Sequence, residues 1–210
     1  VIEALKGAKA RSGILVHCRY LNGSILYPYV GLDEAVPMNT HNYDPNGGTP
    51  LYDQAAVTLA TVLAKVQEFR DNGMPCRTVT LILTDGHDEH SHAHTAQTLC
   101  PVVRDMLMRE NYIIAAMGID DTPKKCPSCS ADLMGLAAGV RECPKCHRGF
   151  SRTDFRAIFR EMDIEDKWIL TPGNSEKEIR AALNLFSQSA VRASQGAASF
   201  SKTALGGFGA

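Results

Sequence analysis

The chain lacks several features that would place it outside the class of ordinary soluble domains. No uninterrupted apolar stretch approaches the length that a bilayer crossing requires. The first residues show no basic segment followed by an apolar run, so they do not look like a signal peptide. Acidic and basic residues nearly balance, at a formal net charge of −1, which gives no broad attraction to nucleic acid or membrane surfaces. We therefore expect a protein that does not associate with membranes.

Catalytic motifs are also missing. The sequence contains no nucleophile motif, no phosphate-binding glycine loop and no H-E-x-x-H helix. Glu89-His90 comes closest to the last of these, but no second histidine stands at the required spacing. We therefore do not expect an enzyme.

The cysteine count does not fit the disulfide framework of a secreted scaffold. There are seven cysteines, an odd number. Cys18, Cys76 and Cys100 are scattered in largely apolar contexts, and we interpret them as buried structural thiols. The other four form two close C-x-x-C pairs, which in a reducing compartment usually indicates a metal site. These patterns favour a cytoplasmic location.

What the chain does contain is an alternation of strand-like and helix-like segments. Strands are predicted at 13–20, 25–30, 77–83, 112–119 and 168–171, and helices at 51–70, 95–109, 153–162 and after the capping box at 175–178. Several strands are apolar throughout, as in a parallel sheet buried on both faces. The expected fold is therefore an α/β, doubly wound, Rossmann-like sheet flanked by helices.

The first two strands read as a hairpin. Asn22-Gly23 separates them, and both residues tolerate the positive φ of a type I′ turn. Pro28 lacks an N–H group, so the second strand should lie at a sheet edge.

The two cysteine pairs predict a zinc ribbon inserted at 120–152. Each C-x-x-C turn presents two thiolates to one ion, and two such turns complete a tetrahedral shell. The predicted zinc ligands are Cys126, Cys129, Cys143 and Cys146. Four thiolates leave no position for water, so the zinc should be structural. His147 adjoins the last cysteine and is an alternative ligand.

A second metal site is predicted where two loops meet the ends of buried strands. Thr49 supplies a hydroxyl in Gly-Gly-Thr-Pro-Leu at 47–51, and Asp85 supplies a carboxylate in Leu-Thr-Asp-Gly at 83–86. Hard cations such as Mg²⁺ prefer oxygen ligands of this kind. The competing interpretation is structural, because Asp-Gly is a frequent turn and Thr-Pro a frequent helix start.

These two motifs, in this order, resemble the von Willebrand factor A (vWA) family. The strand 169–171 before a capped helix and the segment 183–195 strengthen the resemblance, the latter being similar to bacterial intracellular members, including those near tellurite-resistance clusters. The resemblance implies a metal-ion-dependent adhesion site (MIDAS) in which Thr49 and Asp85 bind magnesium or a similar divalent cation. It also implies that a partner protein's carboxylate completes the metal shell, so that the domain binds rather than catalyses.

The sequence departs from the family at one point. The family motif Asp-x-Ser-x-Ser, which follows a first, central strand, appears nowhere in the chain. We expect that the sequence is truncated at its N-terminus or that another segment fills the place of that strand. Without the motif, Mg²⁺ binding should be weak.

A histidine-rich run follows Asp85. His87, Asp88, His90, His92 and His94 lie within eight residues of one another, and imidazoles favour transition metals over Mg²⁺. The run is interpreted as a hydrophilic loop whose His87 and Asp88 support the first site, with a second transition-metal site as the alternative.

The predicted organisation has four parts: a first vWA portion at 1–119, the ribbon at 120–152, a second vWA portion at 153–193 and a flexible tail at 194–210. The predicted function is a metal-dependent protein-binding module. One alternative is a metal-dependent hydrolase that uses the histidine-rich loop. The other, less favoured, is nucleic-acid binding through the bases of the ribbon.

Overall fold

A computed structural model describes residues 1–7, 13–44, 47–136, 140–150, 152–195 and 206–208. The elements in chain order are α1 (Ile2–Lys6), β1 (Leu15–Arg19), β2 (Ile25–Gly31), α2 (Leu51–Asp71), β3 (Thr78–Thr84), α3 (Ala96–Leu107), β4 (Tyr112–Gly118), α4 (Phe155–Glu161), the 3₁₀ turn η2 (Asp166–Trp168), β5 (Ile169–Leu170) and α5 (Glu176–Gln195). The predicted α/β class is confirmed.

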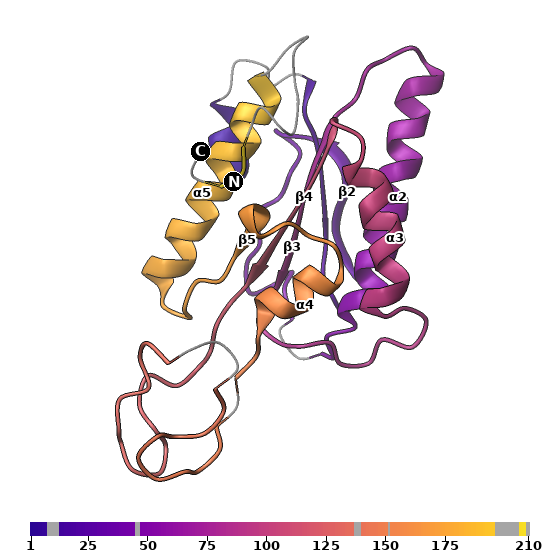
Figure 1. Ribbon diagram of the computed structural model, residues 1–210. Helices are drawn as coiled ribbons and strands as arrows, with labels where there is room; N and C mark the ends of the chain where they lie inside the picture. Colours follow the sequence, from indigo (N-terminus) through magenta and orange to yellow (C-terminus); the bar gives the residue numbers. More distant parts are fainter. Residues whose placement is uncertain (8–12, 45–46, 137–139, 151, 196–205, 209–210) are drawn as a thin grey trace.

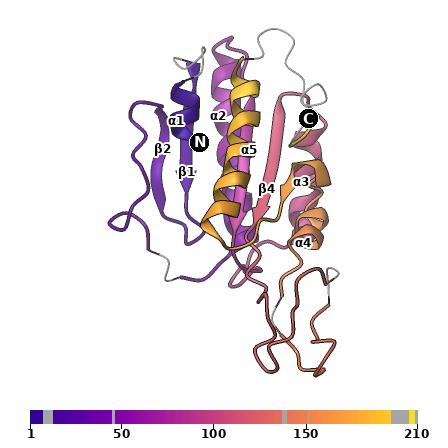
Figure 2. The same cartoon turned by 90° about the vertical axis from the view of Figure 1, so that its left-hand side faces the viewer.

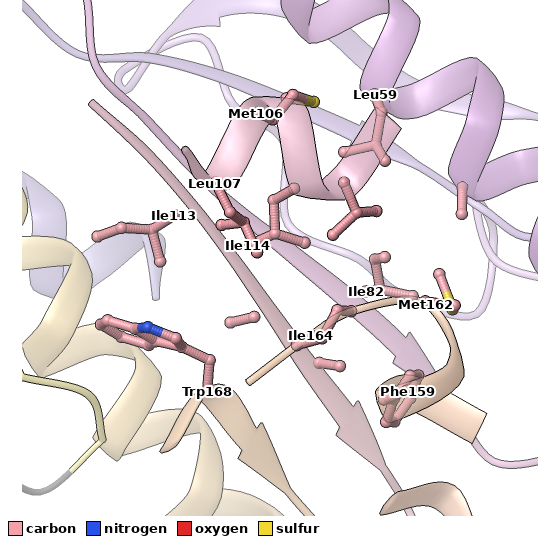
Figure 3. Packing of buried hydrophobic residues seen from close by; sticks show 14 of the residues in the cluster. Leu59, Ile82, Met106, Leu107, Ile113, Ile114, Phe159, Met162, Ile164 and Trp168 are labelled. Carbon is pink, nitrogen blue, oxygen red and sulfur yellow. The ribbon is translucent and has the colours of Figure 1, made fainter. Parts of the chain in front are cut away.

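The centre of the fold is a parallel sheet in the order β3-β4-β5. All seven residues of β4 are buried, because strands pair with it on both edges and helices cover both of its faces. Successive side chains of a strand point to opposite faces, so Ile113 and Ile114 contribute to different layers of the core (Figure 3). This double burial explains why the sequence of β4 is apolar without alternation.

The expectation of one continuous doubly wound sheet is met only in part. β1 and β2 form a separate antiparallel hairpin, and no hydrogen-bonded ladder joins β1 to β3 in the described chain. Figure 2 shows the hairpin on one side of α5 and β4 on the other. Residues 15–19 therefore pair only within the hairpin, and no described residue from 1–20 forms a strand in the parallel sheet.

The hairpin turn differs from the predicted type I′ turn. Gly23 has φ +93°, but Asn22 does not adopt a positive φ. The Gly23 N–H donates to Tyr20 O at 3.0 Å, and the Tyr20 N–H donates to Ser24 O at 2.8 Å. These bonds describe a longer turn that ends in a left-handed glycine. The edge position of Pro28 is confirmed, since β2 pairs only with β1 among the described strands.

Helices cover both faces of the parallel sheet, with α2 and α3 on one side and α5 on the other (Figure 1), while α1 packs against α5 beside the hairpin (Figure 2). Leu59 of α2 and Met106 of α3 pack over β4 from one side, and Trp168 lies on the other (Figure 3). No described helix combines the length and hydropathy that a membrane crossing needs.

The described residues of the C-terminal part lie against the main domain. α5 runs to Gln195. Phe208 then packs edge-on against Trp168, with ring centroids 5.4 Å apart, and its N–H donates to Lys167 O at 2.9 Å. Of the predicted tail at 194–210, the structure describes 194–195 at the end of α5 and 206–208 on the core, and 196–205 and 209–210 lie outside the described residues.

Candidate metal centre and the loop rim

The first cysteine pair forms a tight loop closed by main-chain hydrogen bonds. The Cys126 N–H donates to Ala131 O at 2.8 Å, and the Ser130 N–H donates to Cys126 O at 2.9 Å. Ser130, directly after the second cysteine of the pair, takes a φ of +56°. This left-handed residue turns the chain back, so that both sulfurs of the pair face the same side.

The second pair repeats this loop. The Cys143 N–H donates to Arg148 O at 2.9 Å, and the His147 N–H donates to Cys143 O at 2.8 Å. His147 has a φ of +55° and therefore occupies the position that Ser130 has in the first loop. Its side chain is exposed, and it does not belong to the group of potential metal ligands formed by the four cysteines.

The four sulfurs converge at distances that suit zinc. All four lie within 4.8 Å of one another. The Cys126–Cys146 and Cys129–Cys143 sulfur pairs are each 3.6 Å apart. A tetrahedron of sulfurs around Zn²⁺, with Zn–S bonds of about 2.3 Å, has edges of about 3.8 Å. A disulfide needs about 2.05 Å, so the arrangement fits a shared cation and not a pair of disulfides.

The thiols also influence one another electrostatically. The Ser128 N–H points at the Cys126 sulfur from 3.4 Å and, with the neighbouring cysteines, lowers the pKa of that thiol to about 6. At Cys129 the N–H of Ala131 lowers the pKa, but burial and the other three thiols outweigh it and raise the pKa to about 12. Four thiolates at such distances need a cation to neutralise their repulsion.

The cysteine segment has its own small core, separate from that of the main domain. Leu133 and Phe150 are buried beside Cys126 and Cys143, and none of these residues belongs to the central cluster. The segment projects from the end of the molecule where β4 ends (Figures 1 and 2). A closed four-thiolate shell on a projecting loop is suited to a structural ion rather than to water activation.

A second cluster of polar groups lies where the loop before α2 meets the loop after β3. The Glu89 N–H donates to Thr49 O at 2.8 Å. A Cβ placed on Gly48 would lie 2.3 Å from Nδ1 of His90, so a larger residue at this position would have to displace the His90 side chain. We call residues 47–51 and 85–94 together the loop rim. The main chains of the two loops are thus in contact, and the convergence of the Thr49 and Asp85 side chains on one ion stays a prediction.

The start of α2 is capped by the loop after β3. The helix begins after Pro50, which has no side-chain hydrogen bond as N-cap. Asp88 accepts a hydrogen bond from the Tyr52 N–H at 3.1 Å and from the Ser91 hydroxyl at 2.6 Å. Acceptors at a helix N-terminus satisfy N–H groups that have no partner within the helix. Asp88 therefore has a structural role in joining the two loops.

Asp53 organises the histidine-rich run, a role that the sequence did not reveal. Its carboxylate accepts hydrogen bonds from the N–H groups of His94 at 2.7 Å, His92 at 2.8 Å and Ala93 at 3.1 Å. The N–H of His92 in particular, and those of the other two residues, lower the pKa of Asp53. An acidic residue in the first turn of a helix is too common to predict such a contact from sequence.

Two oxygen-bearing side chains of the loop rim are placed at or near its surface. Asp85 is exposed and Thr49 is half-buried. Thr84, directly before Asp85, donates its hydroxyl to Gly86 O at 2.9 Å and so holds the turn. Unlike Asp53 and Asp88, Asp85 makes no hydrogen bond or ion pair within the described chain. A hydroxyl and a carboxylate are ligand types that suit a hard cation, but these two side chains would supply only part of its coordination shell.

The histidines of the run are not gathered around one point. His87, His90 and His92 are exposed and His94 is half-buried. Across the described residues, the four cysteines are the group of His, Cys, Asp and Glu ligand atoms close enough to hold one metal. The second transition-metal site and the hydrolase alternative therefore stay predictions.

We compared the chain with protein-family models, curated proteins and solved structures, and none of the three gave a match. The geometry therefore defines a mixed α/β protein with a four-cysteine cluster consistent with a zinc site.

Proposed function

We propose that the protein is a metal-ion-dependent protein-binding module of the vWA type, in which a divalent cation on the loop rim links Asp85 to a carboxylate of a partner protein. In this proposal the zinc-bound cysteine segment is a structural element beside the binding surface. Such a role requires oxygen ligands near the surface, which Thr49 and Asp85 of the rim offer.

The observation that carries the proposal is the contact between the two loops. The hydrogen bond from Glu89 N–H to Thr49 O holds the loop that contains Thr49 against the loop that begins with Asp85. Both loops lie where β3 ends, and open α/β sheets bind ligands at the carboxyl ends of their strands. The carboxylates of Asp53 and Asp88 already accept main-chain hydrogen bonds, and Glu89 lies 3.6 Å from Nε2 of His87, so Asp85 is the acid of the rim that has no partner in the described chain.

Mn²⁺ is a suitable probe because it replaces Mg²⁺ on oxygen ligands and broadens the NMR signals of nearby nuclei. On titration with Mn²⁺, the proposal predicts that the amide signals of Thr49 and Asp85 broaden. In the Asp85→Ala variant this broadening should disappear. The matched control is Asp105→Ala, which removes an exposed carboxylate of α3 and should leave the broadening unchanged. Broadening that persists in Asp85→Ala would contradict the proposal.

The partner requires a separate experiment. Proteins retained by the immobilised chain in Mg²⁺ should elute when Mg²⁺ is withdrawn by buffer exchange, while the zinc content of the chain stays constant. Omission is preferable to a chelator here, because a chelator would also remove zinc from the cysteines. A partner that stays bound without Mg²⁺ and also binds Asp85→Ala would show that the cation takes no part.

A further inference from the structure

The sulfurs of the cysteine segment are in contact between its two loops. Sγ of Cys126 lies 3.6 Å from Sγ of Cys146, and Sγ of Cys129 lies 3.6 Å from Sγ of Cys143. Each contact joins a cysteine of the first C-x-x-C turn to a cysteine of the second, and we call them the two cross-loop pairs. A disulfide bond is about 2.05 Å long, so either pair closes by a shift of about 1.5 Å.

The two cysteines of each cross-loop pair differ in exposure. Cys126 and Cys143 are 3% and 0% exposed, and both belong to the small core of the segment. Cys129 and Cys146 are only partly buried, on a segment that projects from the main domain (Figures 1 and 2). A small oxidant therefore reaches one cysteine of each pair first, and the other stands within reach of the oxidised sulfur.

We propose that the cysteine segment is a reversible redox switch, in which hydrogen peroxide oxidises both cross-loop pairs to disulfides and the zinc is released. In each pair the partly exposed thiolate attacks one peroxide oxygen, the O–O bond breaks, and a sulfenic acid and hydroxide form. The buried thiolate then attacks the sulfenic sulfur, the S–S bond forms, and the S–O bond breaks to release a second hydroxide. Each pair thus gives two electrons to one peroxide, and protons from solvent convert both hydroxides to water.

Zinc leaves because it binds thiolates, and the sulfurs of a disulfide no longer carry that charge. The two cross-loop disulfides connect cysteines 20 and 14 residues apart, so they link the two loops to each other. A disulfide within one C-x-x-C turn would leave the loops separate. The oxidised segment therefore stays closed, in a form that a thiol reductant and Zn²⁺ can restore.

The switch acts on the projecting segment alone, because the central cluster of the main domain contains no residue of that segment. It depends on the zinc site of the proposed function and not on the cation of the loop rim. The Asp85→Ala variant separates the two, since it should abolish Mn²⁺ binding at the rim and still release zinc in peroxide as the unchanged chain does.

The first test titrates the zinc-loaded full chain with hydrogen peroxide and measures the released zinc with a chromogenic chelator. About two equivalents of peroxide should release one zinc per chain, and a thiol reductant with added Zn²⁺ should then restore the original zinc content. Cys100→Ser is the matched control, because Cys100 lies on α3 outside the cluster, and it should release zinc in the same way. Zinc that stays bound in excess peroxide, or that does not return after reduction, overturns the proposal.

The second test identifies the disulfides in the oxidised chain. Trypsin cuts after lysine and arginine, so it divides the four cysteines among three peptides, 126–141, 142–145 and 146–148. Cross-loop disulfides join all three peptides, whereas disulfides within the turns join only the two short ones. Mass-spectrometric fragmentation should place Cys126 with Cys146 and Cys129 with Cys143, and any other pairing overturns the proposal.

The third test identifies the cysteine of each pair that meets the oxidant. Dimedone, which traps sulfenic acids, is added together with peroxide to the zinc-loaded chain. The label should appear on Cys129 and Cys146, the partly exposed members of the pairs. A label found mainly on Cys126 and Cys143 overturns the proposed order of attack.

Discussion

Replacing Cys143 by serine tests whether the cysteine segment depends on its metal while the main domain does not. Cys143 is fully buried, and its sulfur lies 3.6 Å from that of Cys129. A closed zinc site contributes about 10–16 kcal/mol to folding of a small module. If four ligands share this equally, the loss of one costs about 2.5–4 kcal/mol, which weakens zinc binding by about two to three orders of magnitude.

The segment has little else to hold it. The side chains of Leu133 and Phe150 contribute about 1.5–3 kcal/mol each through burial, so the metal outweighs both together. The main domain should remain folded, because its central cluster contains no residue of the segment. We therefore expect Cys143→Ser to expose 126–150 to solvent and to leave β4 unaffected.

The assays are metal analysis and amide hydrogen exchange on the same samples. The unchanged chain should contain one zinc, and Cys143→Ser should lose it after dialysis, with rapid exchange in 126–150 and slow exchange in β4. Cys100→Ser is the control, because that cysteine lies on α3 outside the cluster. Zinc retained at full stoichiometry by Cys143→Ser, or a β4 that exchanges as fast as the segment, would refute the reasoning.

Three further predictions concern close contacts. A Cβ on Gly118 would lie 2.1 Å from Cγ of Phe155, so Gly118→Ala should destabilise the main domain by about 1–3 kcal/mol or more in urea unfolding, and an unchanged midpoint would contradict the contact. Gly48→Ala should displace His90 and speed amide exchange in the loop rim, and the added change His90→Ala should restore most of the protection; equal exchange in the single and double variants would argue against this. Main-chain donors lower the pKa of Asp53, so its stabilising effect is present above the unfolded value of about 3.9 and is lost as the pH falls through the lower folded value. At pH 6 the amides of His92–His94 should therefore exchange more slowly in the unchanged chain than in Asp53→Asn, and in strong acid the two should exchange equally. A difference in exchange that stays constant with pH would rule out the carboxylate as the stabilising group.

Local patterns were enough to predict much of the secondary structure. The apolar run that forms β4 was predicted as a strand buried on both faces, and the C-x-x-C spacing predicted two turns that each present a pair of sulfurs. Both depend on interactions between near neighbours in sequence, which a single chain displays directly. The hairpin was predicted for the same reason, although its turn type was wrong because Asn22 does not adopt a positive φ.

Contacts between distant segments could not be predicted in this way. Nothing in the sequence indicated that the Asp53 carboxylate would bind main-chain groups about forty residues away, or that Asp88 would cap α2. Asp and Glu are common in first helical turns and in loops, so their residue type does not identify a partner. Only the packing of α2 beside the loop after β3 makes these carboxylates structural and leaves Asp85 at the surface.

By itself the sequence determined the α/β class, the segments that become strands and helices, and the four cysteines that can share an ion, because each is encoded by periodicity or spacing within a short stretch. The tertiary structure decided that β1 and β3 remain unpaired among the described strands and that the two loops of the rim meet. The physical reason is that strand pairing and loop contact depend on which surfaces remain after the helices have packed, and no local pattern records that result.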